Sequence, residues 1–133
     1  MKTTGDILDS TVKIKIKKKL IETIAEASKN VYPEEFIGLL RKNRKGEVAM
    51  LLLIPLSTFG RSFSSIRSDM LPMNLGDCGS VHSHPSSDAR PSAADLRFFQ
   101  KKEINLIIGY PYNEMTVKAY NKDGKLLNIE IVD

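Results

Sequence analysis

The chain has 133 residues, of which 41% are apolar and 27% are charged, and it carries a net charge of +4 at pH 7. This composition excludes an intrinsically disordered chain, and the length predicts one domain over residues 1–133 with its own core. The single cysteine, Cys78, excludes an internal disulfide, and no segment is apolar over the roughly 20 residues that a membrane-spanning helix needs. Because residues 1–10 also lack the apolar run of a signal peptide, we expect a soluble cytoplasmic protein that contacts no membrane.

The most basic segment, KIKIKKK at Lys13–Lys19, could be a nucleic-acid patch or the solvated face of a strand. Ile14 and Ile16 alternate with the lysines, which is the pattern of a strand with one wet face. No aromatic side chains that could stack on bases are interleaved with these lysines. We therefore expect a solvated strand here and no nucleic-acid partner.

Strands and helices are predicted in an irregular order. A strand is expected over residues 11–16, and a helix over 17–30 because apolar residues recur there at three- and four-residue spacing. Further strands are expected over 35–43, 44–56, 78–84, 104–110, 115–120 and 125–132, with a second helix over 92–102 and a hairpin at Asp123-Gly124. Elements that intermix without strict alternation favour an α/β (mixed α+β) domain around one sheet.

Both histidines of the chain lie two residues apart, at His82 and His84. On a strand, side chains two apart share a face, with Cα atoms ~6.6–6.8 Å apart. Two imidazoles at that separation can bind one zinc ion at roughly 2.0–2.1 Å each. The alternative is two unrelated polar residues at the end of a strand.

Ser92 and Asp95 follow, with the spacing of a capping box at a helix start. Asp95 in the first turn of a helix would also be a rigidly placed third metal ligand. In that case we expect Asp95 not to reach back to the Ser92 amide, which would leave Ser92 free to act on a substrate. Two histidines and one carboxylate leave the fourth zinc position to water, which is the catalytic arrangement. Such a site needs a base and an oxyanion donor, and Ser92 is the candidate donor.

His82-Ser83-His84, seven residues, Ser92, two residues and Asp95 together resemble the JAMM motif of MPN-plus metallopeptidases, H-[ST]-H-x7-S-x2-D. The upstream P-x-E-x-x-G-L-L stretch of that family is matched by PEEFIGLL, residues 33–40, with Glu35 at the glutamate position. The resemblance implies one curved mixed β-sheet flanked by helices, of cytidine-deaminase-like architecture. It also implies a zinc hydrolase in which His82, His84 and Asp95 hold Zn²⁺, Glu35 deprotonates water and Ser92 stabilises the oxyanion.

The same resemblance implies cleavage of peptide or isopeptide bonds after C-terminal glycines of ubiquitin-like proteins. Only Ser57–Asp77 could serve as a substrate-gripping insertion in so short a chain, which favours the compact prokaryotic-type members that act on ubiquitin-like or sulfur-carrier proteins with diglycine tails. Release of an amino acid from a sulfur-carrier C-terminus, and a non-catalytic MPN scaffold, are the alternatives. Cys78 shares strand parity with the histidines, although we expect it to be an apolar filler. The chain could be a monomer or a homodimer.

Overall fold

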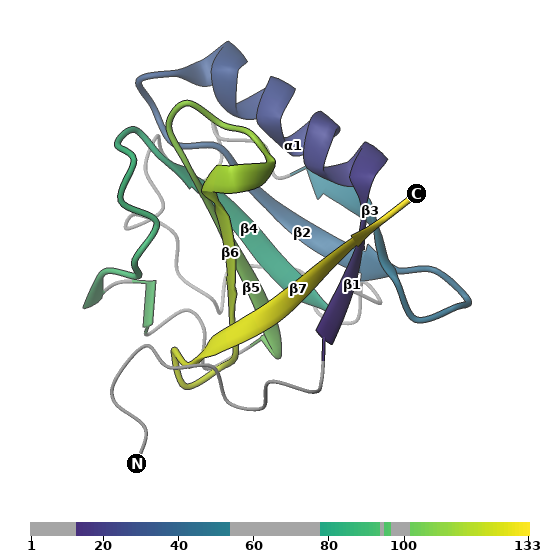
Figure 1. Cartoon of the computed structure of the whole chain (residues 1–133). Coiled ribbons are helices and arrows are strands. Elements are labelled where there is room, and N and C mark those ends of the chain that lie inside the picture. The colour runs from purple at the N-terminus through teal and green to yellow at the C-terminus, as the bar shows by residue number, and fades with distance from the viewer. Residues whose placement is uncertain (1–12, 54–77, 94, 97–101) are drawn as a thin grey trace.

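The computed structural model describes residues 13–53, 78–93, 95–96 and 102–133 (Figure 1). The elements described in full are β1 (Lys13–Lys17), α1 (Lys18–Val31), β2 (Ile37–Lys42), β3 (Val48–Leu53), β4 (Gly79–His84), β5 (Ile104–Gly109), the short 3-10 helix η3 (Glu114–Thr116), β6 (Val117–Tyr120) and β7 (Leu126–Val132). The predictions for residues 11–12, for Ser57–Asp77 and for most of the helix over 92–102 fall outside the described residues. Within the described part of the chain, no helix is both long and apolar enough to cross a membrane.

One mixed sheet contains all these strands, in the order β1-β3-β2-β4-β5-β6-β7. Strand β1 is parallel to β3 and β7, and β4 is parallel to β5, whereas the remaining neighbours are antiparallel. Because β1 pairs with both β3 and β7, the sheet closes into a barrel. The predicted α/β class with one curved mixed sheet is confirmed, and the closure is a feature that the sequence pattern did not predict.

Helix α1 covers one side of this sheet (Figure 1). Its apolar residues form a stripe at helical spacing, which buries them against the strands while Lys18, Lys19 and Glu22 stay exposed. The core beneath the helix is formed by Ile16, Leu20, Ile21, Ile24, Phe36, Leu40, Val48, Val81, Leu106 and Ile108, among others. On β4, Val81 points to this core, so its neighbours His82 and Ser80 point to the opposite face of the sheet.

Most predicted boundaries agree with the structure to within two residues. Lys13 and Lys15 are exposed while Ile16 is buried, as expected for a strand with one wet face. The hairpin at Asp123-Gly124 forms, with Gly124 at a φ of +82°. The strand expected from residue 115 begins instead at Val117, because the Asn113 side chain accepts a hydrogen bond from the Met115 amide and starts η3.

Candidate metal centre

Strand β4 lies in the middle of the sheet, between β2 and β5, and carries both histidines at its C-terminal end. The two imidazoles project from the same face, with their Nε2 atoms 3.1 Å apart. His82 is fully buried and the His84 side chain is 14% exposed. The predicted shared face of the two histidines is therefore present, and the pair lies at the border between core and solvent.

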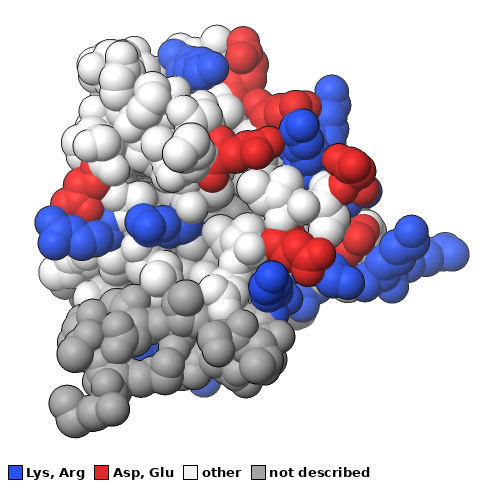
Figure 2. Space-filling view, viewed as in Figure 1, with Lys and Arg blue, Asp and Glu red and all other residues white. Residues whose placement is uncertain are grey.

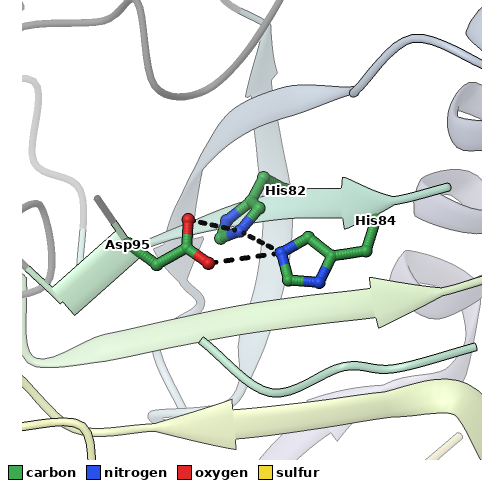
Figure 3. A group of neighbouring side chains, drawn as sticks. All are labelled: His82, His84 and Asp95. Carbon is green, nitrogen blue, oxygen red and sulfur yellow. Dashed lines mark hydrogen bonds and ion pairs between the residues drawn. The ribbon is translucent and has the colours of Figure 1, made fainter. Parts of the chain in front are cut away.

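Asp95 approaches the imidazoles from the helix start that follows the loop after β4 (Figure 3). Its Oδ1 lies 3.0 Å from the Nε2 of His82, and its Oδ2 lies 3.2 Å from the Nε2 of His84. The donor atoms of these three side chains all lie within 4.8 Å of one another. Asp95, which is eleven positions after His84, thus converges on one point with the two histidines.

This donor set fits a zinc ion. In a tetrahedral site with bonds of 2.0–2.1 Å, neighbouring donor atoms are about 3.3 Å apart. The Nε2 and carboxylate oxygen atoms here are 3.0–3.2 Å apart, which is slightly closer and is typical of hydrogen bonds. Small side-chain rotations would increase these distances to those of a zinc site. Two histidines and one carboxylate complete three zinc positions and leave the fourth open.

The loop over residues 85–91 holds His84 in the orientation that metal binding requires. The Nδ1 of His84 is 2.9 Å from the carbonyl oxygen of Asp88, which is positioned to accept the Nδ1 proton. That interaction favours the tautomer whose Nε2 faces His82 and Asp95 with a free lone pair, as is usual for metal-binding imidazoles.

Two further residues fix the same loop on the sheet. The Tyr120 hydroxyl, from β6, donates a 2.8 Å hydrogen bond to the Ala89 carbonyl, and burial is the main cause that raises the pKa of Tyr120 to about 12. At Gly109, a Cβ atom would lie 2.9 Å from the Ser86 carbonyl oxygen, so a side chain there would push the loop away. Sequence reasoning missed both residues, and a single sequence holds no signal for them because the contacts span more than 20 residues.

A capping box connects Ser92 and Asp95. The Asp95 amide donates to the Ser92 Oγ over 3.1 Å, and the Ser92 amide donates to the Asp95 Oδ2 over 2.7 Å. Asp95 therefore faces the two histidines and reaches the Ser92 amide at the same time in the metal-free chain, whereas the expectation for a metal-bound Asp95 stays a prediction. A carboxylate has two oxygens, each with two lone pairs, and Asp95 uses them toward the helix start and the histidines at once. The exposed Ser92 Oγ accepts one bond here, which leaves its own proton available to a substrate.

The electrostatics of the cluster match an ionised Asp95. Burial opposes ionisation of this carboxyl group, but hydrogen bonds from His82 and His84 outweigh it, so the pKa of Asp95 lies well below its usual range. Burial likewise opposes the charged form of His84, yet the hydrogen bond to Asp95, the Asp88 carbonyl and the nearby carboxylates of Asp95 and Glu35 raise its pKa. In the metal-free chain, a proton therefore competes with metal for the Nε2 of His84.

Glu35 lies opposite His84, just before β2 begins. Ile37 pairs with His82 across the antiparallel strands, so the position two residues earlier on β2 falls beside the position two residues later on β4. Glu35 is half-buried, and its carboxylate is close enough to affect the charge state of His84. It is not one of the three residues of the donor cluster. The expected placement of Glu35 toward the histidine face is thus seen in the register.

Aromatic side chains border the same end of the sheet. Tyr32 follows α1 and Tyr110 follows β5, and their rings lie 5.1 Å apart, centre to centre, with Tyr112 packed beneath them. Tyr32 and Tyr110 are each about half exposed, whereas Tyr112 is buried. Figure 2 shows that charged side chains gather mainly on the right of this view, while its upper left, over the end of α1 and the segment after β5, is largely uncharged.

Cys78 takes no part in the donor cluster. Its side chain is partly buried against the core, and its amide donates to the Leu40 carbonyl over 2.8 Å. The group that could hold a metal in the described chain contains His82, His84 and Asp95 without a thiol. The placement agrees with the expected role of Cys78 as an apolar filler.

Zinc binding should weaken in acid. Below the raised pKa of His84, a proton must leave Nε2 before the metal can bind, so we expect the apparent affinity to fall by about tenfold per pH unit there. Titration calorimetry between pH 8 and pH 5.5, in buffers of different ionisation enthalpy, should show the matching proton release on binding. An affinity that is constant over this range, with no proton released, would contradict the assignment of His84 as a ligand.

Three comparisons with known proteins agree on the family. The family model for prokaryotic homologues of the JAB domain matches residues 17–121. A Haloferax volcanii protein named "Probable metalloprotease" is 32% identical over 117 residues, which cover 81% of this chain and 73% of that protein.

Solved structures show the same relationship. A JAB1/MPN domain protein from Archaeoglobus fulgidus is 35% identical, with a TM-score of 0.73 over 90% of this chain and all of the other. A structure described as "JAMM: A Metalloprotease-like Zinc Site in the Proteasome and Signalosome" is also 35% identical, with a TM-score of 0.70 over 92% of this chain and all of the other. The chain belongs to the family of prokaryotic homologues of the JAB domain, and its fold is that of the JAB1/MPN proteins.

Proposed function

We propose that this protein is a zinc-dependent metallopeptidase that hydrolyses the peptide or isopeptide bond after the C-terminal diglycine of ubiquitin-like or sulfur-carrier proteins. The observation that carries the proposal is the convergence of His82, His84 and Asp95 on one point, with Glu35 across the strand pair from His84. The metalloprotease name of the Haloferax volcanii relative and the zinc site named for the JAMM structure support the same chemistry.

His82, His84 and Asp95 would hold the zinc ion. When bound, zinc lowers the pKa of a coordinated water to about 7 and polarises a carbonyl group. The Ser92 amide already binds Oδ2 of Asp95, so Oδ1 is the carboxylate oxygen better placed to serve as ligand. Because His84 and Asp95 are each held by a backbone group, the site is organised before metal arrives.

Glu35 and Ser92 supply the proton transfer and the oxyanion donor. Glu35 lies close to the donor cluster but is not one of its three residues. Its carboxylate can therefore accept a proton from the attacking water and pass it to the leaving amine. Ser92 keeps a hydroxyl proton for hydrogen bonding to the developing oxyanion while its lone pair caps the helix. The two groups come from different segments, Glu35 from just before β2 and Ser92 from just after the loop over residues 85–91.

The rim of the site suits an extended tail of small residues. Tyr32 and Tyr110, each about half exposed, present aromatic surface next to the segments that carry Glu35 and His84. A diglycine tail offers backbone hydrogen bonds and no side chain to exclude. The aromatic rim is compatible with a diglycine tail, which needs no pocket for a side chain.

The experiment is a combined zinc and cleavage assay. We expect one zinc per chain, and cleavage after the second glycine in ubiquitin-like and sulfur-carrier proteins that carry a C-terminal fusion or an isopeptide-linked lysine. Chelation should abolish cleavage and added zinc should restore it, while matched substrates ending in Ala-Ala should be poorer by at least about tenfold. Stoichiometric zinc without cleavage of any of these substrates would contradict the proposal and favour the scaffold alternative.

A further inference from the structure

The serine between the two histidines lies on the other face of β4 from the imidazoles, in contact with the segment that carries Glu35. Ser83 is fully buried. Its amide donates a 2.9 Å hydrogen bond to the Phe36 carbonyl, which continues the pairing of β2 with β4. The Phe36 amide donates in return over 2.7 Å, but to the Ser83 side-chain Oγ.

This side-chain acceptor marks the place where β2 leaves the regular ladder. An antiparallel pair of this kind normally exchanges two backbone hydrogen bonds. Here the hydroxyl takes the place of one backbone carbonyl, which is why β2 begins at Ile37 and the chain turns before it. A buried amide that lost this acceptor would have no water to bond with, so the hydroxyl is required by the geometry.

The bonded amide belongs to the peptide unit that joins Glu35 to Phe36. Because a peptide unit is planar, holding its N–H fixes the direction from which the Glu35 backbone enters the site. The Phe36 side chain is buried in the core beneath α1, so the unit is held on its other side as well. Ser83 thus contacts the peptide unit that adjoins the Cα of Glu35, and the Glu35 carboxylate is the proposed base.

We infer that Ser83 is a positioning residue, whose hydroxyl holds the Glu35–Phe36 peptide and thereby sets the Glu35 carboxylate beside the metal centre. The inference rests on the proposed function for its catalytic consequence, but the contact itself can be tested without activity. It gives a physical reason for a hydroxyl side chain between two metal-binding histidines. Strand β4 places His82 and His84 at the metal centre on one face, and on its other face it places Ser83 against the segment that carries Glu35.

The test replaces Ser83 in the full-length, zinc-loaded protein. In Ser83→Ala, we expect the Phe36 amide to exchange with solvent at least tenfold faster, measured by NMR, while the zinc affinity changes by less than about threefold. Cleavage should lose about 10- to 100-fold in kcat with little change in KM, the size of effect that follows a misplaced catalytic group. The loss should vanish in a Glu35→Gln background, because both changes would then act on the same group.

Two variants of equal shape separate the hydroxyl from packing. Ser83→Thr keeps the acceptor and should keep Phe36 protection and most activity, whereas Ser83→Val lacks it and should behave like Ser83→Ala. The matched control is Ser80→Ala, which removes another fully buried serine of β4 that bonds Asn105 over 2.6 Å and does not touch the Glu35 segment. Equal losses of kcat in the Ser80 and Ser83 variants, or unchanged Phe36 exchange in Ser83→Ala and Ser83→Val, would overturn the inference. If the wild-type protein cleaves nothing, the proposed function fails and the exchange data alone decide on Ser83.

Discussion

Replacing Glu35 with glutamine should reduce cleavage by roughly 10²–10⁴-fold, the range that a general base contributes, while one zinc remains bound. The amide side chain keeps the size of the carboxylate but cannot accept a proton from water. Zinc should stay because His82, His84 and Asp95 form the donor cluster without Glu35. Steady-state kinetics on a diglycine substrate, together with metal analysis of the same sample, measures both quantities.

The neighbouring glutamate provides a control for this variant. Glu34→Gln removes the same charge one residue earlier, at the variable position of the PEEFIGLL stretch, in the turn where the Glu34 amide donates to the Val31 carbonyl. We expect its kcat to remain within about threefold of wild type, since surface charge changes away from a site have small effects. Equal losses in the two variants, or zinc loss in Glu35→Gln, would contradict the assignment of Glu35 as the base.

Replacing Asp95 should remove the metal, and the choice of substitute separates its two roles. Asp95→Ala deletes both the ligand and the N3 side chain that accepts from the Ser92 amide. We expect zinc affinity to fall by at least about 100-fold, because loss even of a group that supports a ligand costs 10–100-fold. The lost cap should also destabilise the metal-free chain by about 1 kcal/mol.

Asp95→Asn should retain the cap and still lose the metal. An asparagine carbonyl can accept the Ser92 hydrogen bond, but it is neutral and binds zinc poorly. Competition with a chromophoric chelator measures the affinity, and thermal unfolding of the metal-free variants measures the cap. The control is Asp88→Asn, an exposed acid in the loop over residues 85–91 whose carboxylate pairs with Arg90 and is not part of the donor cluster. Wild-type zinc affinity in Asp95→Asn would show that Asp95 is no ligand.

The parts of the site that depend on local spacing could be predicted from the sequence. Two-residue spacing on a strand placed His82 and His84 on one face, and three-residue spacing at a helix start placed Ser92 and Asp95 together. The upstream glutamate needed the resemblance, because nothing in the spacing of Glu35 from His82 implies that they meet. The pairing of β2 with β4 brings them together, and such long-range pairing has no signature in one sequence.

The remaining differences have the same physical origin. Barrel closure depends on the parallel pairing of β1 with β7. The paired residues are more than 100 positions apart in the chain, so the periodicity within either strand does not indicate that the two strands pair. Asp95 can cap the helix start and face the histidines together because a carboxylate offers more lone pairs than one partner uses, a point that residue spacing alone does not indicate. The H-[ST]-H pattern includes Ser83 but gives it no role, and its partner, the Phe36 amide, could not be found from the pattern because it is 47 positions away.

X-ray absorption spectroscopy of the purified zinc-loaded protein, at neutral pH, tests the metal centre most directly. The structure predicts one zinc per chain with two imidazole nitrogens at about 2.0–2.1 Å, carboxylate and water oxygens at similar distance, and no sulfur. Only one imidazole nitrogen should remain in His84→Ala, and the whole site should be lost in Asp95→Ala. A substoichiometric zinc content, or a sulfur ligand at about 2.3 Å that would come from Cys78, would contradict the site built on His82, His84 and Asp95.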